Sequence, residues 1–247
     1  MKLPKIIGHR GACGYAPENT LESIRTAAEI GATWVEMDVK LSKDCVPIIL
    51  HDDTLERTTN GSGKVADTLY TDIEALDAGA WYAESFAGAK VPTLEEAVDV
   101  ILELGLGLNL EIKPCPGREV ETAEAALDVL SRIWDDADKL LISSFQHVSL
   151  ESAREMAPEW RRGLLIDTPM RDWAALADYL KVSTINIDGR DLSLTREGVE
   201  AYLESGLGVL AYTINDPMRA RTLFSWGVDG VFSDVPDAIE GSLNLRH

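Results

Sequence analysis

Residues 5–20, KIIGHRGACGYAPENT, contain in order the elements from which the whole fold is built. Residues 5–8 form a short apolar run, which is typical of a buried strand. Asn19 stands three residues before a glutamate, the spacing of a helix-capping box, so a helix is predicted to follow. Packing gives no reason for a buried strand to end in His9 and Arg10. We therefore expect their partners to come from elsewhere in the chain.

The same order of strand, loop and helix repeats along most of the chain. Predicted strands cover residues 5–8, 33–41, 46–50, 108–112, 140–144, 162–166, 184–187, 208–213 and 230–233. Amphipathic runs such as 94–104 and 120–134 predict helices between them, and Thr93 and Thr195 have the positions of N-caps. This alternation predicts parallel strands that are joined by crossover helices.

The predicted strands are one more than a closed eightfold barrel needs. The connection at residues 43–45 is too short for a parallel crossover, which normally takes a dozen or more residues. We therefore interpret the run at 46–50 as an antiparallel return or an extension at the rim. Eight strand–helix units remain, and the predicted fold class is α/β, a (β/α)8 TIM barrel.

Residues 52–90 interrupt the alternation with a segment rich in Thr, Asp, Gly and aromatic residues. Loops beyond about 15 residues are usually functional lids or small subdomains. We interpret this segment as an inserted subdomain or lid after the second strand–helix region, with one or two short helices. No Pro/Gly/Ser-rich linker divides the chain, so residues 1–247 are predicted to form a single domain.

The composition excludes some classes of partner. The chain has 42 acidic and 23 basic residues and a formal net charge of −19. Nucleic acids and anionic membranes bind basic patches, so neither is an expected partner, whereas a small anionic substrate is compatible because surface charge is screened within about 8 Å. The composition leaves the oligomeric state open.

The cellular location is predicted from the cysteines and from the hydropathy of the chain. Its three cysteines have no C-x-x-C spacing, which fits a reducing compartment. The first residues lack the apolar stretch of a signal peptide, and no run approaches the roughly 20 apolar residues of a membrane span. We therefore expect a cytoplasmic protein.

Three carboxylates are predicted to converge where barrel active sites lie, at the carboxyl ends of the strands. Glu36 and Asp38 are two residues apart on one strand, so their side chains share a face. Such a pair can be two solvated carboxylates at a rim, but apolar residues flank this one. With Glu111 from the neighbouring strand, the cluster needs a cation, and oxygen ligands favour Mg²⁺ or Ca²⁺ over Zn²⁺. One divalent cation, Mg²⁺ or Ca²⁺, is therefore predicted at these residues.

Two basic side chains accompany the carboxylates. Lys113 shares a strand face with Glu111, so it either forms a simple ion pair or reaches a substrate anion beside the cation. Arg10 follows the first strand, and its planar guanidinium suits a phosphate or a carboxylate. Both are predicted to bind a substrate anion.

The chain has four histidines, and His9 and His51 stand at strand ends next to the acidic cluster. Imidazoles titrate near neutral pH, so this pair can act as base and acid in turn. His147 and His247 are interpreted as structural or incidental. A cation, two basic groups and two histidines together predict phosphoryl chemistry.

Cysteine chemistry is a less favoured alternative. Cys13 and Cys115 fall in loops on the predicted active face, but neither has a spacing that suggests activation of a thiol nucleophile. Small buried cysteines are common in proteins for reasons of packing alone.

Several short motifs occur together in a fixed order. They are H-R-G at 9–11, P-E-N-T at 17–20, E-M-D-V at 36–39, H-D-D-T-L-E-R-T-T-N-G at 51–61, E-I-K at 111–113 and G-V-D-G-V-F-S-D at 227–234. This ordered set resembles the glycerophosphodiester phosphodiesterase family over nearly the whole chain. The resemblance implies a (β/α)8 barrel with a small insertion. It also implies hydrolysis of glycerophosphodiesters, such as glycerophosphocholine or glycerophosphoethanolamine, to sn-glycerol 3-phosphate and an alcohol.

The resemblance also implies roles for the residues that match its motifs. These are acid/base catalysis by His9 and His51, metal binding by Glu36, Asp38 and Glu111, and phosphate contacts by Arg10 and Lys113. In the mechanism that the family implies, the glycerol 2-hydroxyl attacks phosphorus and water opens the cyclic intermediate. The spacing of the residues does not distinguish this route from direct attack by water.

Aromatic residues are expected to shape the substrate pocket. Phe145, Tyr212 and Trp226 are predicted to line it, although Trp226 packing at the barrel rim is an equal alternative. Family members often carry tryptophan where this chain has Tyr212. Two other functions stay open: a lyase of the same barrel class that releases a cyclic phosphate, and a noncatalytic protein that binds a phosphate ligand. The noncatalytic protein would be expected to lack a histidine or a metal carboxylate, and none is missing.

Overall fold

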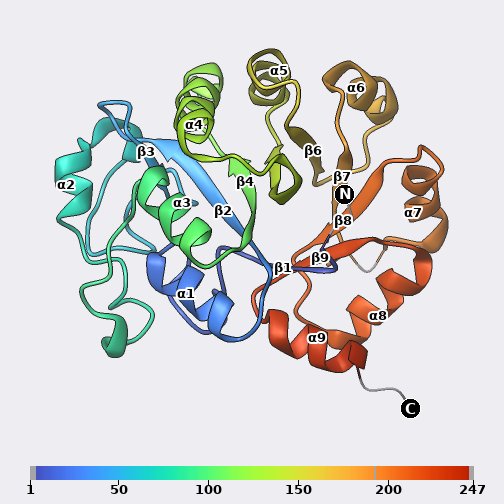
Figure 1. Ribbon diagram of the computed structural model, residues 1–247, viewed down its shortest axis with the longest axis horizontal. Helices are drawn as coiled ribbons and strands as arrows, with labels where there is room; N and C mark the ends of the chain where they lie inside the picture. The colour runs from blue at the N-terminus through green and yellow to red at the C-terminus, as the bar shows by residue number, and fades with distance from the viewer. Residues whose placement is uncertain (1–3, 192, 245–247) are drawn as a thin grey trace.

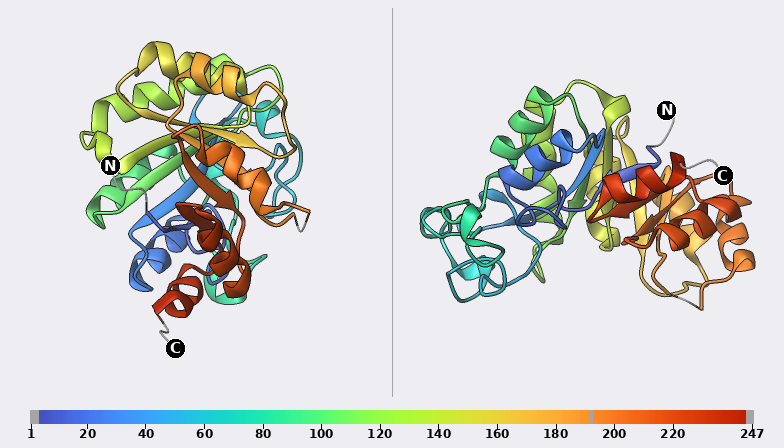
Figure 2. Two further views of the ribbon diagram at one scale, coloured as in Figure 1. Left: turned by 90° about the vertical axis from the view of Figure 1, so that its right-hand side faces the viewer. Right: turned by 90° about the horizontal axis from the view of Figure 1, so that it is seen from below.

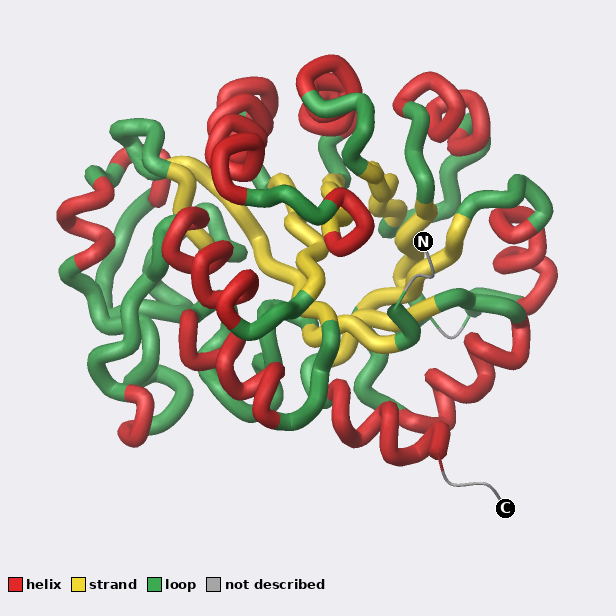
Figure 3. Tube along the Cα trace, in the orientation of Figure 1, coloured by secondary structure: helices red, strands yellow, loops and turns green. Residues whose placement is uncertain are grey.

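In the computed structural model, which describes residues 4–191 and 193–244, eight parallel strands close into a barrel with helices outside it (Figures 1 and 3). With one additional strand, β3, the described strands are β1 (Ile6–Gly8), β2 (Trp34–Leu41), β3 (Pro47–Ile49), β4 (Gly107–Ile112), β5 (Leu140–Ser144), β6 (Arg161–Ile166), β7 (Thr184–Asp188), β8 (Gly208–Tyr212) and β9 (Gly230–Ser233). Strands β4 to β9 pair in chain order, and β1 pairs with both β9 and β2, which closes the barrel. The predicted TIM barrel is confirmed.

The additional strand β3 is antiparallel to β2 and lies outside the closed barrel. Val39 pairs with Ile49, and Leu41 pairs with Pro47. The prediction of an antiparallel return after a short turn is therefore correct.

Helices follow the strands, and some of their N-caps could be predicted from the sequence. They are α1 (Leu21–Glu29), α3 (Leu94–Glu103), α4 (Glu119–Ile133), α5 (His147–Met156), α6 (Trp173–Leu180), α7 (Arg196–Leu203), α8 (Pro217–Trp226) and α9 (Pro236–Asn244). Thr93 and Thr195 are N-caps as predicted. The prediction for Asn19 is wrong, because Thr20 caps α1 and forms a capping box with Ser23.

Strand β2 shows how side-chain alternation positions the site. Val35, Met37 and Val39 belong to the apolar cluster that joins β2 and β4 to helices α1, α3 and α4. Successive side chains on a strand point to opposite faces, so Glu36 and Asp38 face the barrel interior. Burial of each of these apolar side chains against the helices stabilises the folded state by about 1.5–3 kcal/mol. A one-residue slip of the strand would lose this burial, so the register is fixed.

The segment predicted as an insertion, residues 52–90, lies to one side of the barrel (Figure 2). It contains the short helix α2 (Tyr70–Glu74) and the 3₁₀ turns η1 (Val65–Asp67) and η2 (Glu84–Phe86). Side chains of this segment pack with those of β3 in a separate apolar cluster. Lys40, fully buried on β2, donates a 2.8 Å hydrogen bond to Asp53 and so ties the segment to the barrel. Among the described residues, no helix combines the length and apolarity needed to cross a membrane.

Candidate active site

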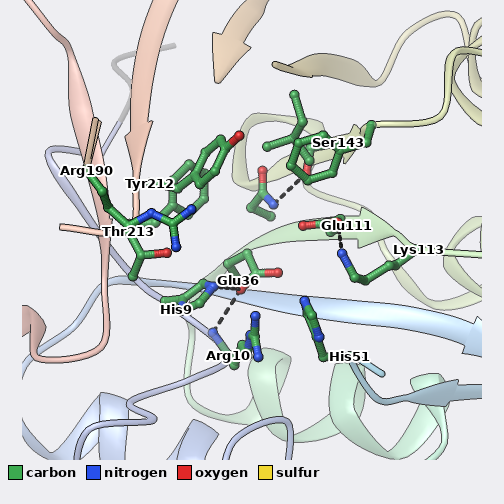
Figure 4. Close-up of a pocket in the computed structure, with 14 residues that line it drawn as sticks. His9, Arg10, Glu36, His51, Glu111, Lys113, Ser143, Arg190, Tyr212 and Thr213 are labelled. Carbon is green, nitrogen blue, oxygen red and sulfur yellow. Dashed lines mark hydrogen bonds and ion pairs between the residues drawn. The ribbon is translucent and has the colours of Figure 1, made fainter. Parts of the chain in front are cut away.

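A cavity of about 290 Å³ opens at the carboxyl ends of the strands (Figure 4). The predicted site residues in its wall are His9, Arg10, Glu36, His51, Glu111, Lys113, Phe145 and Tyr212. Trp226 instead ends α8, where its ring lies 5.3 Å from the guanidinium of Arg219, which corrects the prediction that it lines the cavity. Trp226 is partly buried and packs against an apolar cluster that includes Leu223 of the same helix.

The three predicted metal ligands come together on β2 and β4. One oxygen from each of Glu36, Asp38 and Glu111 lies within 4.8 Å of the others. Asp38 and Glu111 are register partners on the two paired strands. Glu36 and Asp38 are almost completely buried, so they are not solvated rim carboxylates.

The electrostatics of this cluster fit a hard divalent cation. Oε1 of Glu36 is buried and accepts no hydrogen bond from any described residue, and such an oxygen is costly to ionise without a partner. Burial, together with the charges of Asp38 and Glu111, raises the pKa of Glu36 well above its usual value. Burial and Asp38 likewise raise the pKa of Glu111 to about 7. A bound cation would neutralise the repulsion between the three carboxylates, and Oε1 of Glu36 could coordinate it. Mg²⁺ and Ca²⁺ both prefer such oxygen ligands.

Arg10 contributes both its backbone and its side chain to the site. It adopts a positive φ of 50°, and its backbone N–H donates a 2.9 Å hydrogen bond to Oε2 of Glu36. Its guanidinium donates to Glu18 at 2.7 Å, and its Nε lies 3.5 Å from Asp38. Burial would raise the pKa of Asp38, but Arg10, His51 and Lys113 outweigh it and lower that pKa.

The turn after β1 depends on glycine and asparagine. Gly11 has a φ of 86°, and a Cβ at this position would collide with Ser23 of α1. Asn19 donates a 2.8 Å hydrogen bond from its amide to Oδ2 of Asp38, and its Oδ1 accepts from the backbone N–H of Asp38. Asn19 therefore holds Asp38, a candidate metal ligand, rather than capping a helix.

His9 is oriented by a carboxylate from the opposite end of the sequence. Its Nδ1 lies 2.7 Å from Oδ1 of Asp234, which also accepts a 2.9 Å hydrogen bond from Sγ of Cys13. Oδ2 of Asp234 accepts from Asn215 at 2.6 Å. The Nε2 atom of His9 lies 4.0 Å from Oε2 of Glu36. Asp234 was missed as a site residue, although its place at the end of β9 inside a family motif was a usable signal.

Cys13 does not have the surroundings of an activated nucleophile. Burial and the neighbouring Asp234 carboxylate raise the pKa of its thiol far above the ordinary value. Thiolate, rather than thiol, is the nucleophilic form, so this environment disfavours attack by Cys13.

His51 is oriented in a similar way by its chain neighbour. Its Nδ1 lies 2.7 Å from Oδ1 of Asp52. Asp52 accepts 2.6 and 2.9 Å hydrogen bonds from Arg57, whose guanidinium also bonds both oxygens of Glu18 at 2.7 Å. Burial, with the positive charges of Arg10 and Lys113, lowers the pKa of His51. A continuous chain of hydrogen bonds therefore links His51 to Arg10 through Asp52, Arg57 and Glu18.

Lys113 connects the acidic cluster to an aromatic wall. Its Nζ donates a 3.1 Å hydrogen bond to Glu111 and lies 5.4 Å from the centre of the Phe145 ring. The ring centres of Phe145 and Tyr212 lie 5.8 Å apart in an edge-to-face arrangement, and the Tyr212 hydroxyl donates to the backbone oxygen of Ile166. Lys113 therefore pairs with Glu111 and also lines the cavity, so the two roles predicted for it do not exclude each other.

Other residues of the cavity were not predicted from the sequence. Arg190 reaches the wall two residues after β7 ends, and Asp188 holds it with hydrogen bonds of 2.9 and 2.7 Å. Its position after a strand end was the available signal. His147 begins α5 and is not part of this wall, and His247 lies outside the described residues.

Comparisons with known proteins agree with this geometry. The glycerophosphoryl diester phosphodiesterase family model matches residues 9–238. A glycerophosphodiester phosphodiesterase of Caldanaerobacter subterraneus subsp. tengcongensis is 32% identical over 238 residues, which cover 95% of each chain. A phosphodiesterase of Oleispira antarctica, solved in complex with the product sn-glycerol-3-phosphate, is 41% identical with a TM-score of 0.94, covering 98% of this chain and 97% of that one. The chain therefore belongs to the glycerophosphoryl diester phosphodiesterase family of enzymes.

Proposed function

We propose that this enzyme hydrolyses glycerophosphodiesters, such as glycerophosphocholine and glycerophosphoethanolamine, to sn-glycerol 3-phosphate and an alcohol. One Mg²⁺ or Ca²⁺ ion would be held by Glu36, Asp38 and Glu111. The observation that carries the proposal is that two carboxylate-anchored histidines line the same cavity as Glu36 and Glu111, which cluster with the buried Asp38. The product complex of the Oleispira antarctica relative supports the choice of product.

Positive charge in the cavity favours binding of a phosphodiester. When bound, the divalent cation stabilises negative charge on phosphate oxygens. Arg10 and Lys113 add two cationic groups that can donate hydrogen bonds to the same oxygens. Glu111 and Asp38 outweigh burial and raise the pKa of Lys113, so this amine stays charged at neutral pH.

The two histidines supply proton transfer. With a proton on Nδ1, His9 donates a hydrogen bond to Asp234 and His51 donates one to Asp52, which leaves Nε2 of each ring available for the substrate. One histidine takes the proton of the attacking oxygen, and the other donates a proton to the leaving alcohol. The anchoring carboxylates stabilise each imidazolium when it forms. The attacking oxygen is either the glycerol 2-hydroxyl, which gives a cyclic intermediate, or that of water.

The walls of the cavity suggest where the organic parts of the substrate lie. Phe145 and Tyr212 form an apolar side against which the glycerol or the leaving alcohol packs. Residues 52–90 serve as a subdomain that supports the site, since Asp52 and Arg57 belong to it. The proposed location is the cytoplasm, where the free thiols of Cys13, Cys45 and Cys115 remain reduced.

One assay tests the proposal. The purified enzyme is incubated with glycerophosphocholine and Mg²⁺ or Ca²⁺, and sn-glycerol 3-phosphate is measured with and without EDTA. We expect product only with the cation, and recovery when the cation is restored. Absence of metal-dependent product would refute the proposal, and accumulation of cyclic glycerophosphate as the final product would identify a lyase instead.

A further inference from the structure

The imidazole of His9 lies between two different groups of ligand atoms. Its Nε2 is 4.0 Å from Glu36, whereas its Nδ1 is 2.7 Å from Asp234 and 3.9 Å from Sγ of Cys13. One nitrogen, one sulfur and one carboxylate oxygen meet on the Nδ1 side, all within 4.8 Å of one another. We propose that Cys13, His9 and Asp234 form a second cation site, for a thiolate-preferring divalent ion such as Zn²⁺, whose occupancy inhibits the enzyme.

The positions of the three ligand atoms are close to those of a tetrahedral zinc site. Zinc–ligand bonds of about 2.0–2.3 Å imply ligand separations of roughly 3.4–3.6 Å. Here Asp234 Oδ1 lies 2.7 Å from Nδ1 and 2.9 Å from Sγ, with 3.9 Å between nitrogen and sulfur. Asp234 must withdraw by roughly 0.6 Å and the other two atoms must approach by about 0.3 Å. Side-chain rotations of this size leave the backbone in place.

The donor atoms separate this site chemically from the acidic cluster. Glu36, Asp38 and Glu111 offer only oxygen, which suits Mg²⁺ or Ca²⁺. A thiolate and an imidazole nitrogen suit Zn²⁺ and other softer ions. The two sites can therefore be occupied by different ions at the same time, with the His9 ring between them.

The second site is open to solvent on one side. The side chains of His9 and Asp234 are 18% and 28% exposed, and Cys13 is only partly buried. Water can therefore reach the ion as a fourth ligand, as in zinc sites that have three protein ligands.

Binding of the ion changes what His9 can do with protons. The ion displaces the thiol proton of Cys13 and the proton on Nδ1 of His9, and both leave to solvent. With Nδ1 bound to the ion, a neutral His9 carries its proton on Nε2 and has no free lone pair there. His9 then cannot accept a proton from substrate, which stops the step in which His9 acts as the base. This consequence rests on the proposed acid/base role of His9, whereas the binding of the ion does not.

The site is tested with the intact enzyme under saturating Mg²⁺. Zn²⁺ binding is measured by calorimetry, and inhibition of glycerophosphocholine hydrolysis is measured relative to the zinc-free rate of each protein. Cys13→Ser keeps a hydroxyl donor for Asp234 but removes the thiolate, and Cys13→Ala is the second variant. Cys45→Ser, which changes an exposed thiol outside the cavity, is the matched control.

We expect the wild type and Cys45→Ser to bind one Zn²⁺ in addition to Mg²⁺ and to be inhibited by it. Loss of a direct ligand in the Cys13 variants should weaken binding and inhibition by more than the roughly 10- to 100-fold that loss of an outer-shell partner causes. In the wild type, Co²⁺ should produce a thiolate-to-metal charge-transfer band that the Cys13 variants lack.

Equal zinc affinity in the wild type and the Cys13 variants would overturn the proposal, as would absence of zinc binding to the Mg²⁺-loaded wild type. If the enzyme hydrolysed no glycerophosphodiester, the proposed function would fail. The calorimetric and cobalt measurements would still decide whether the second site exists, because neither requires turnover.

Discussion

Oδ1 of Asp52 lies 2.7 Å from Nδ1 of His51. The same distance separates Oδ1 of Asp234 from Nδ1 of His9. Asp52 is the chain neighbour of its histidine, whereas Asp234 is 225 residues away from His9. Both imidazoles are thus held at Nδ1 by an aspartate, although the two aspartates come from different parts of the chain. This common orientation is the reason for assigning both histidines to proton transfer.

Loss of either imidazole should remove one proton-transfer step. We expect His9→Ala and His51→Ala each to lower kcat by about 10²- to 10⁴-fold, the usual contribution of general acid/base catalysis. Circular dichroism and thermal unfolding should show that both variants remain folded. His147→Ala, a histidine on α5 outside the cavity, is the matched control. Near-normal turnover in either of the first two variants would refute the assignment.

Arg57 should act on catalysis through the groups that it holds. It binds Asp52 and Glu18 with a planar fork that a glutamine cannot reproduce. We expect Arg57→Gln to lower kcat by roughly tenfold or more, given the usual strength of charged hydrogen bonds.

The pH profile separates this role from a merely structural one. Arg57 is the largest cause of the lowered pKa of Asp52, so that pKa should rise in Arg57→Gln. Without the guanidinium, the charge of Asp52 is no longer neutralised and favours the protonated form of His51, so the acid limb of the rate profile should move upward. Arg132→Gln, which removes an exposed pair with Asp128 on α4, should leave the profile unchanged. An unshifted acid limb in Arg57→Gln would contradict this prediction.

Cation binding should compete with protons. The pKa of Glu111 is raised to about 7 and that of Glu36 is raised well above its usual value, so the cation-free site holds protons near neutral pH. A cation binds the deprotonated carboxylates and must release those protons. Affinity for Mg²⁺ or Ca²⁺ should therefore rise from about pH 6 to about pH 8. Calorimetry in buffers of different ionisation enthalpy measures the release, and an affinity independent of pH would exclude this linkage.

Gly11 should be less tolerant of substitution than another glycine with positive φ. Gly11 and Gly31 have φ values of 86° and 91°, but only at Gly11 would a Cβ meet Ser23, whereas space surrounds Gly31. Urea unfolding should show Gly11→Ala to be less stable than Gly31→Ala by about 1–3 kcal/mol, the usual range for overpacking. Equal free energies of unfolding for the two variants would contradict this prediction, because α1 would then make room for the added Cβ without loss of stability.

Most of the fold could be predicted because hydrophobic periodicity and chain-length limits restrict it. The short connection before β3 excluded a parallel crossover and left an antiparallel return or an extension at the rim, and that strand is antiparallel. The cap of α1 was misjudged because Asn19 and Thr20 are both good N-caps, and local sequence does not show that Asp38 binds the asparagine.

The candidate site could be predicted in part, because strand ends in a barrel share one face. Residues on strands or directly after them, such as Glu36 and His51, lie where the pattern placed them. Asp234 does stand at a strand end, but periodicity does not report that its partner is His9. Arg57 lies beyond the strand ends, and its hydrogen bonds to Glu18 have no signal in the local sequence. Trp226 was wrongly predicted to line the cavity. The sequence around an aromatic residue near the end of a helix does not show whether its ring packs at the rim or lines a pocket.

The central claim is that one cation site and two histidines act on the same phosphodiester. A crystal structure of the enzyme with Ca²⁺ and sn-glycerol 3-phosphate tests it most directly. We predict Ca²⁺ about 2.3–2.6 Å from oxygens of Glu36, Asp38 and Glu111. We also predict Nε2 of both His9 and His51 within about 3.2 Å of ligand oxygens. A cation held by other residues, or a ligand beyond the reach of either histidine, would contradict the account.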